Sequence, residues 1–587
     1  MFPWHQFPLP LALLQLIQFR NELRENNLHD TAQLADTEKL PNPQPSPDGR
    51  YLVARTADGS FNDLSQPEMG MAGTRFGRNV PLAEANVDQK NLLEPNPRLV
   101  SSVLLKRDEF IPATILNLHA ASWIQFQTHD WFSHGDNDPN SQFSVPPVSA
   151  HTADGNGPEN QPLAVDKTIK DPSRSDDNTR AATFINEVTH WWDASQLYGS
   201  DEETVDSLRS HQSGKMRIEA DGLLPLDDSG IDLVGFPGSA GGWWIGLSLL
   251  HTLFVKEHNA ICDRLQQRYP DWNDAQLFDK ARLINAALLA KIHTVEWTPA
   301  ILPNPATQVA MNANWWGLLG KEVKEITGHL GDSEILSGIV GSPTDHHGAP
   351  YYLTEEFVSV YRMHPLIPDE INFYSHRSGE HLSVKPFPTV FGKRARNAMQ
   401  AMAIEDSFYS FGVQHPGAIT LHNYPNFLRA LVKEDGAHPF DLAAVDILRD
   451  RERGVPRYNR FREIVGRGRV SSFEELTSNP QWAKELREVY KGDINSVDLM
   501  VGLFAEELPE GFGFSDTAFR VFILMASRRL KSDRFFTADY RADIYTQLGL
   551  DWIDNNSLLT VLRRHYPALS PALYGLENGF QPWRKLR

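Results

Sequence analysis

Residues 123–131, Trp-Ile-Gln-Phe-Gln-Thr-His-Asp-Trp, decide the fold class of this 587-residue chain. They fall within an expected helix over 114–133, in which Gln125 and His129 are four positions apart and share one face. Asp130 is rotated by about 100° and can serve a different site on the neighbouring face. One histidine alone is more often a packed core residue than a ligand. An imidazole with an amide beside it and an acid on the next face indicates a reactive site.

A second motif, Tyr-Arg-Met-His-Pro-Leu, occupies residues 361–366. Tyr361 and His364 are three positions apart, which places them on the same face of a helix. Pro365 disfavours helical geometry at the residue before it, so the helix is expected to end near His364. A phenol one turn from a metal-ligating imidazole suits one-electron chemistry. A packed aromatic residue is the commoner interpretation of Tyr361 when it is taken alone.

A third motif, Thr-His-Trp-Trp-Asp-Ala-Ser-Gln-Leu-Tyr-Gly, occupies residues 189–199. It offers three side-chain oxygens and one backbone carbonyl, from Thr189, Asp193, Ser195 and, for the carbonyl, Trp191. Calcium binds six to eight hard oxygen ligands, several of them from one loop. Asp130 would supply the remaining charge from its helix. A capped turn without metal is the alternative that the spacing leaves open.

Apolar residues recur at helical spacing through much of the remaining chain, and sustained alternation of apolar and polar residues is almost absent. Residues 41–110 indicate loops with short helices, and residues 135–180 indicate a long polar surface excursion. The sequence therefore predicts a mainly α-helical protein with one catalytic domain over residues 31–587. Further helices are expected at 246–268, 274–298, 353–364, 394–403, 441–451, 481–491 and 517–531.

The first 30 residues are expected to form an amphipathic helix ahead of that domain. Residues 7–17 are largely apolar, and charged residues follow them. A secretory signal would carry basic residues before the apolar run and small residues after it, and this segment has neither. The helix is expected either to pack on its own protein or to lie on a membrane surface. No uninterrupted apolar stretch reaches the roughly 20 residues that span a bilayer.

The composition excludes one class of function and indicates a compartment. A net charge of −19 argues against nucleic-acid binding, because phosphate recognition needs a concentrated basic face. The single cysteine, Cys262, excludes an intrachain disulfide and suits a reducing compartment. A cytoplasmic location is therefore expected, with peripheral membrane contact as an option and with no obligatory protein partner.

Together these segments resemble the animal-type haem peroxidase superfamily, which includes cyclooxygenases and fatty-acid α-dioxygenases. The resemblance runs from Asn117 to about Pro567 and includes His-Thr-Leu-Phe-Val-Lys-Glu-His-Asn at 251–259 and a second long motif at 441–456. The chain looks most like the α-dioxygenases, on the basis of its N-terminal Trp-His with an apolar helix and of residues 293–298, 361–364 and 528–537. The resemblance implies a cyclooxygenase-like helical fold that binds haem b.

The same resemblance implies roles for single residues. His129 would be the distal histidine, with Gln125 beside it. His364 would be the proximal iron ligand, and Tyr361 the residue that becomes a radical. Asp446 stands where the peroxidases carry an asparagine and is expected to orient His364, because proximal imidazoles usually donate their second N–H to an acceptor. The residues that match the family's calcium loop are Asp130, Thr189, Trp191, Asp193 and Ser195.

Departures from the true peroxidases imply haem that is bound without a covalent link. Myeloperoxidase-like enzymes carry an acid directly before the distal histidine, where this chain has Thr128. They also carry a distal arginine and a second haem-linking acid shortly before the His-Thr-Leu motif, where residues 239–246 read Ser-Ala-Gly-Gly-Trp-Trp-Ile-Gly. Peroxide heterolysis without a distal cation should be poor. The chain is therefore expected to activate a tyrosine rather than to turn over peroxide.

A fatty-acid substrate needs a partner for its carboxylate, and Arg529 is the candidate. An apolar stripe leads up to it on one helix face, formed by Phe519, Phe522 and Ala526. A guanidinium at the end of an apolar wall suits carboxylate recognition. A surface ion pair of Arg529 with Asp533 or Glu506 is the alternative. By the resemblance, His293 and Thr298 line the same carboxylate pocket.

The expected reaction is insertion of O₂ at Cα of a long-chain fatty acid, which gives a 2-hydroperoxy acid. A radical on Tyr361 would abstract the Cα hydrogen, because a carboxylate anchored near the haem presents Cα rather than a mid-chain carbon. Other functions remain open on this scaffold. They are a cyclooxygenase- or diol-synthase-like mid-chain oxygenase, a plain haem peroxidase, and a haem-storage or sensor protein without catalysis.

Overall fold

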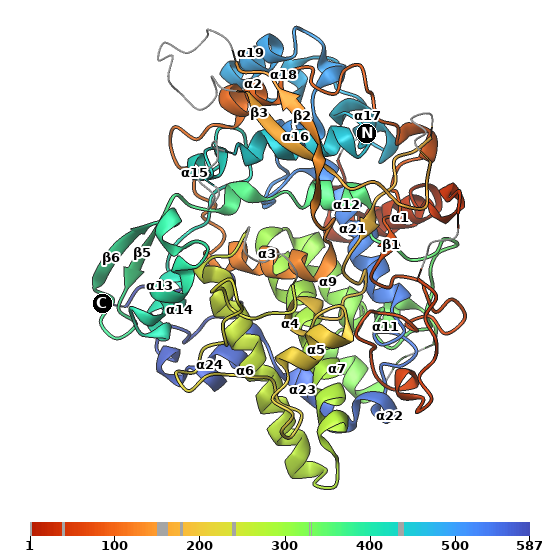
Figure 1. The fold of residues 1–587 in the computed structure, drawn as a ribbon, viewed down its shortest axis with the longest axis vertical. Coiled ribbons are helices and arrows are strands. Elements are labelled where there is room, and N and C mark those ends of the chain that lie inside the picture. The colour runs from red at the N-terminus through yellow and green to blue at the C-terminus, as the bar shows by residue number, and fades with distance from the viewer. Residues whose placement is uncertain are drawn as a thin grey trace.

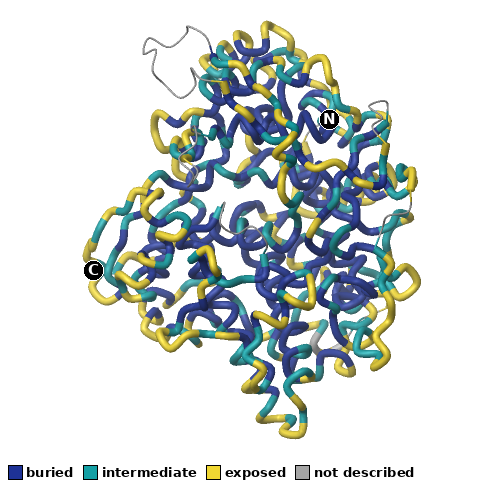
Figure 2. The backbone as a smooth tube through the Cα atoms, in the orientation of Figure 1, coloured by how far each residue is buried: buried dark blue, intermediate teal, exposed yellow. Residues whose placement is uncertain are grey.

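The computed structural model describes residues 3–37, 41–148, 162–175, 180–236, 242–327, 329, 331–432 and 440–586. Helices form most of the regular structure and surround a buried centre (Figures 1 and 2). The main hydrophobic core draws on side chains from both ends of the chain. The predicted mainly α-helical fold class is confirmed. Among the described residues, no helix is long and apolar enough to cross a membrane.

Three helices build the centre of the molecule. Helix α3 (His119–Trp131) packs on α6 (Ile245–Arg268), which packs on α7 (Asp274–Ile292) (Figure 1). The first half of α6 is buried on all sides, as expected for a helix that is apolar around its whole circumference. A capping box starts α7, because Asn273 and Gln276 bond each other's backbone N–H groups. The chain then continues without a break through a π-helical turn (His293–Trp297) into α8 (Thr298–Ile301).

Helix α12 (Glu355–Val360) carries the second motif and is shorter than predicted. The Thr354 hydroxyl accepts a hydrogen bond from Phe357 N and so caps its start. The helix ends before Tyr361, and His364 opens a separate 3₁₀ turn (His364–Leu366). The prediction that Tyr361 and His364 share a helix face is therefore wrong. Pro365 directly restricts only His364, so it does not account for a helix that ends four residues earlier, at Val360.

The N-terminal helix packs on its own protein. Helix α1 (Leu9–Asn26) lies against α21 (Asp516–Ser532) and α9 (Pro305–Trp316), with Ala12, Leu16 and Leu23 buried. Ahead of it, Trp4 is buried and donates a hydrogen bond from Nε1 to Asp516 Oδ1 at 2.9 Å. The exposed side of the helix carries further leucines, Leu9, Leu11 and Leu14.

The described residues form three two-stranded antiparallel sheets, and the shortest of them, which pairs residues 74–75 with 185–186, is largely buried. They pair β1 (Thr74–Arg75) with β4 (Ile185–Asn186), β2 (Asn137–Val145) with β3 (Leu163–Thr168), and β5 (Glu370–Tyr374) with β6 (His381–Pro386). The predicted polar excursion over 135–180 therefore contains a strand pair. Sequence periodicity missed it because most β2 side chains are exposed or half-buried, so that no apolar alternation marks the strand.

The helices predicted at 394–403, 441–451 and 481–491 are confirmed to within three residues, as α13 (Arg394–Gln400), α16 (Leu442–Glu452) and α19 (Pro480–Val489). Four further helices were not predicted: α14 (Ile404–Gly412), α20 (Leu499–Ala505), α23 (Gln547–Asn555) and α24 (Leu558–His565). Shorter helical turns include α2 (Pro97–Val100), α4 (Ser195–Tyr198), α5 (Glu202–Leu208), α10 (Lys321–Thr327), α11 (Glu334–Ser337), α15 (Asn426–Arg429), α17 (Tyr458–Ile464), α18 (Phe473–Leu476) and α22 (Ala542–Tyr545).

Candidate active site

The proximal histidine of the prediction is held by a buried acid. Nδ1 of His364 lies 2.9 Å from Oδ2 of Asp446, on α16. Asp446 also accepts hydrogen bonds from Arg362 Nη1 at 2.6 Å and from the Tyr424 hydroxyl at 2.9 Å. Although burial opposes it, the neighbouring His364 and Arg362 lower the pKa of Asp446 to about 2. The side chain of His364 is 34% exposed, so Nε2 remains available to a metal.

Gln125 and His129 lie on α3, as predicted. The His129 ring stacks on Phe236 with 4.0 Å between ring centroids, and its Nδ1 has no hydrogen-bond partner among the described residues. Burial lowers the pKa of His129 to about 3, which keeps the imidazole neutral. Gln125 donates from Nε2 to the Gly242 carbonyl at 2.9 Å and accepts from Trp244 Nε1 at 2.8 Å. Gln125 thus anchors the segment that leads into α6, and its catalytic role stays a prediction.

These residues fit a haem group. An imidazole whose Nδ1 lies against a carboxylate can bind iron through Nε2, and a carboxylate is a partner that metal-ligating histidines commonly use. His129 offers a neutral ring with an unpaired nitrogen. Residues 239–241 of the stretch compared with the peroxidases lie outside the described residues. The described part, Gly242–Gly246, carries no acid or arginine that could link or polarise the group.

Arg529 is buried between two indole rings. Its guanidinium carbon lies 4.0 Å from the Trp131 ring centroid and 4.2 Å from that of Trp192, and the residue is 1% exposed. The alternative partners Asp533 and Glu506 pair with other arginines. Nε and Nη2 of Arg529 have no hydrogen-bond partner among the described residues. Because unpaired buried donors are costly, these two nitrogens are suited to a ligand with acceptor oxygens.

His293 lies beside the same pair of indoles. Its ring centroid is 5.2 Å from those of Trp131 and Trp192, and its Nδ1 accepts a hydrogen bond from Trp123 Nε1 at 3.2 Å. Burial and then the charge of Arg529 lower the pKa of His293, so the ring is neutral and carries its proton on Nε2. The Thr298 hydroxyl donates to the His293 carbonyl at 2.9 Å and supports the π-helical turn.

Tyr361 completes this cluster. Its ring lies 5.1 Å from Trp131, 4.6 Å from Phe357 and 5.8 Å from Phe522, and the residue is 6% exposed. Burial raises the pKa of the phenol, which therefore keeps its proton. Trp131 thus touches the phenol as well as the two predicted carboxylate partners. The sequence analysis did not identify Trp131 and Trp192 as site residues. The sequence offered one signal for them, because Trp131 follows Asp130 and Trp192 precedes Asp193, the two acids that were predicted to bind calcium.

The predicted calcium ligands converge where α3 meets the loop over 189–199. Asp130 Oδ1 accepts hydrogen bonds from Ser195 N at 2.5 Å and from Ser195 Oγ at 3.0 Å. The Thr189 hydroxyl donates to Asp193 Oδ1 at 2.9 Å. Ala194 has a φ of 63°, a conformation that L-residues rarely adopt and that brings its two neighbours into the same turn.

The two acids have the electrostatics of a cation site. Oδ2 of Asp130 and Oδ2 of Asp193 are buried without a hydrogen-bond partner among the described residues. Burial raises the pKa of both carboxyls, and for Asp130 the charge of Asp193 adds to the effect. Arg282 Nη2 lies 3.6 Å from Asp193 Oδ2, which compensates one charge in part. No cluster of three or more His, Cys, Asp or Glu side chains suited to a metal exists among the described residues, so calcium would rely on neutral oxygens, including the Trp191 carbonyl.

The sequence model of the animal haem peroxidases matches residues 54–573. This chain belongs to the animal haem peroxidase family. Membership implies a haem cofactor, in agreement with the fit of His364 and Asp446. Peroxidase A from Dictyostelium discoideum shares the fold, with a TM-score of 0.71 at 20% identity.

Within this family the chain groups with the α-dioxygenases. Alpha-dioxygenase 2 from Arabidopsis thaliana is 39% identical and is matched over 99% of this chain and 91% of its own length. The crystal structure of Oryza sativa fatty acid alpha-dioxygenase is 36% identical, has a TM-score of 0.90, and is matched over 99% of this chain and 94% of its own. A further rice structure, with a TM-score of 0.89, carries a tyrosine-to-phenylalanine substitution and contains palmitic acid. The predicted family and fold are confirmed.

Proposed function

We propose that this protein inserts O₂ at Cα of long-chain fatty acids and so produces 2-hydroperoxy acids. One observation carries the proposal: Trp131 touches the Tyr361 phenol as well as Arg529 and His293. A carboxylate bound by Arg529 and His293 would therefore have its adjacent carbon, Cα, next to the phenol. The α-dioxygenase relatives, and the palmitic acid in the rice structure, support this substrate class.

The residues of the chain perform most steps of the reaction. Bound haem supplies the oxidising equivalent that removes a hydrogen atom from Tyr361. Arg529 and the Nε2–H of His293 hold the carboxylate, which fixes Cα near the phenol oxygen. The Tyr361 radical takes the Cα hydrogen, O₂ adds to the carbon radical, and the peroxyl radical recovers a hydrogen atom from Tyr361. The buried phenol starts each cycle protonated.

The test is oxygen uptake with palmitate by the haem-loaded protein, coupled to mass spectrometry of the product. The proposal requires oxygen at carbon 2. Oxygen at a mid-chain carbon would indicate the cyclooxygenase-like alternative, and rapid guaiacol oxidation without fatty-acid oxygenation would indicate a plain peroxidase. Absence of uptake with every fatty acid would favour a storage or sensor protein.

Removal of the Arg529 side chain should weaken the binding of acids selectively. Arg529→Ala deletes a charge-assisted hydrogen bond, which contributes about 1.5–3 kcal/mol, or roughly one to two decades in affinity. Palmitate should therefore lose that much affinity, while its methyl ester should lose much less. Dissociation constants for both ligands, measured by haem difference spectra, provide the check. Equal losses for acid and ester would mean that Arg529 serves only the structure.

Calcium is proposed as a structural ion held by Asp130, Thr189, Trp191, Asp193 and Ser195. Asp193→Asn keeps the volume of the side chain but removes its charge, so it should release the ion. A site filled at 100 times its dissociation constant contributes about 2.7 kcal/mol of stability, so the melting temperature should fall. Haem occupancy should fall as well, since Asp130 and His129 are adjacent on α3. Pure protein that contains no tightly bound Ca²⁺ by elemental analysis would contradict the proposal.

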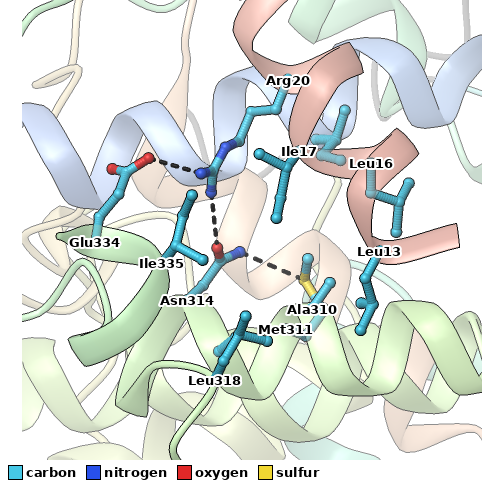
Figure 3. A pocket seen from close by; sticks show the side chains of 12 residues that line it. Leu13, Leu16, Ile17, Arg20, Ala310, Met311, Asn314, Leu318, Glu334 and Ile335 are labelled. Carbon is cyan, nitrogen blue, oxygen red and sulfur yellow. Dashed lines mark hydrogen bonds and ion pairs between the residues drawn. The ribbon is translucent and has the colours of Figure 1, made fainter. Parts of the chain in front are cut away.

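We also propose that α1 contacts the lipid surface from which the substrate enters. A cavity of about 50 Å³ separates Leu13, Leu16 and Ile17 of α1 from Met311 on α9 and from Leu318 beyond it (Figure 3). Arg20 also lines the cavity and bonds Asn314 at 3.3 Å and Glu334 at 2.7 Å (Figure 3). Ile523 of α21 also lines the cavity, and the same helix carries Arg529.

The outward leucines of α1 should account for most of this lipid contact. Replacing Leu9, Leu11 and Leu14 together with serine should weaken sedimentation with phosphatidylcholine vesicles at least about tenfold, because burial of one leucine contributes about 1.5–3 kcal/mol. Turnover of detergent-dispersed palmitate should not change. Leu382→Ser removes an equally exposed leucine from β6 and is the matched control. Unaltered sedimentation of the triple variant would remove α1 from this role.

A further inference from the structure

We propose that Arg529 has a second role, which is to keep the radical on Tyr361 by making the two adjacent indoles difficult to oxidise. The inference rests on the proposed tyrosyl-radical function. It concerns a different property of Arg529 from carboxylate binding, namely the effect of its charge on Trp131 and Trp192.

Trp131 lies close enough to Tyr361 to compete for the radical. Its ring is T-shaped against the phenol, with 5.1 Å between centroids. Trp192 follows at 5.8 Å from Trp131. Both indoles are buried in the same core as Tyr361. An oxidising equivalent on the phenol can therefore move to Trp131 and from there to Trp192. After such a transfer the phenol could no longer take the hydrogen from Cα.

The transfer is a balanced exchange of one electron and one proton. The Tyr361 phenoxyl would take an electron from the Trp131 indole, together with the proton of Nε1, to give phenol and a neutral indolyl radical. That N–H has no hydrogen-bond partner among the described residues. Because no described residue accepts a hydrogen bond from this N–H, the indole carries positive charge as it is oxidised.

Arg529 opposes that positive charge at both rings. Its guanidinium carbon is 4.0 Å from one indole centroid and 4.2 Å from the other, which is closer than its 5.5 Å to the Phe357 centroid. A cation over an aromatic face is attracted by the π-electron density that oxidation removes. Guanidinium groups stay protonated in proteins, and this one lacks partners for Nε and Nη2. Of the groups that act electrostatically on it, Tyr351 comes first, and burial raises the pKa of that phenol and keeps it neutral; Asp130 follows, with Oδ1 accepting hydrogen bonds from Ser195.

The experiment locates the radical by electron paramagnetic resonance. Haem-loaded protein is mixed with peroxide in the absence of fatty acid and frozen within milliseconds, after production with ring-deuterated tyrosine or, separately, ring-deuterated tryptophan. In the natural protein, only tyrosine deuteration should narrow the signal. In Arg529→Gln, the signal should become sensitive to tryptophan deuteration, and adding Trp131→Phe to that variant should abolish this sensitivity.

Two further variants separate charge from packing. Arg529→Lys keeps the positive charge and should restore the tyrosyl signal. Arg520 lies on the same helix, with its guanidinium 4.0 Å from the Phe19 ring centroid, so Arg520→Gln removes a stacked arginine away from Tyr361 and should leave the radical unchanged. Haem content and circular dichroism establish that each variant is folded.

The outcomes distinguish this inference from the proposed function. A natural protein without any tyrosine-sensitive radical would overturn the radical mechanism itself. A tyrosyl radical that stays on Tyr361 in folded Arg529→Gln would overturn only the second role of Arg529. A radical that is sensitive to tryptophan deuteration already in the natural protein would show that the indoles relay the oxidising equivalent, which also contradicts the inference. If Arg529→Gln fails to fold, Arg529→Met and Arg529→Lys provide the same comparison of neutral and charged side chains.

Discussion

Tyr361→Phe is expected to abolish oxygen uptake with fatty acids while leaving haem binding intact. Phenylalanine keeps the ring contacts with Trp131, Phe357 and Phe522, at 4.6 to 5.8 Å, but has no O–H hydrogen to lose. The variant should therefore fold, show the haem spectrum of the natural protein and still react with peroxide. Without a phenoxyl radical, no group can take the Cα hydrogen, so oxygen consumption with palmitate should fall to background. A Clark electrode and the Soret band provide the two measurements.

Loss of oxygen uptake in this variant can be assigned to the missing phenol only if the variant still binds haem. A Tyr361→Phe preparation must first be matched to the natural protein in haem per chain. Tyr409→Phe is a suitable control, because Tyr409 is a buried tyrosine on α14 whose hydroxyl is bonded to Leu586 N. The control should oxygenate palmitate normally. Substantial oxygenation by fully loaded Tyr361→Phe would show that another residue, or none, abstracts the hydrogen.

His364→Ala should remove the Soret band or shift it strongly, since it deletes the proposed axial ligand. Asp446→Asn keeps the size of the acid but removes its charge, and changes to a residue that orients a metal ligand cost about 10- to 100-fold in metal affinity or activity. His364→Ala is therefore expected to lower haem affinity more than Asp446→Asn does. Spectroscopic haem titration of the apoprotein measures both.

A second His–Asp pair in the same molecule provides the control. Nδ1 of His376 lies 2.6 Å from Asp406 Oδ1, and the His376 side chain is 5% exposed. His376→Ala thus removes a buried, acid-paired imidazole that has no place in the haem proposal, and haem affinity should not change. A normal haem spectrum in His364→Ala would take the axial role away from His364.

Long apolar helices were predictable because their periodicity is a property of the local sequence. The boundaries of α6 and α21 agree with expectation to within one residue. The α12 boundary was not predictable in the same way, because the chain leaves the helix at Tyr361 to place His364 beside Asp446, a partner more than 80 residues away. Tertiary contacts decided the geometry there, and local helical spacing did not.

The residues of the candidate site were predictable where a family motif identifies them. They were not predictable where only their packing in the folded structure identifies them. Arg529, His293 and Tyr361 were all identified in the sequence, and the structure brings them around one indole. Trp131 was quoted with its motif but was not recognised, since a tryptophan at a helix end has no chemical signature of its own. Its importance follows from which three side chains touch it, and that is a three-dimensional fact.

The π-helical turn between α7 and α8 begins at His293, and Thr298, the first residue after the turn, donates a hydrogen bond from its hydroxyl to the His293 carbonyl. Such a turn spans one residue more than an α-helical turn, and π-turns of this kind occur often at functional sites. Loss of one codon from 293–297 would restore a continuous α-helix, because the wide turn takes up one extra residue. The helix would survive that deletion, but the wide turn that begins at His293 would be lost. One residue thus separates an ordinary core helix from a helix with a wide turn at the proposed site, so a change in chain length can alter this site without any substitution in it.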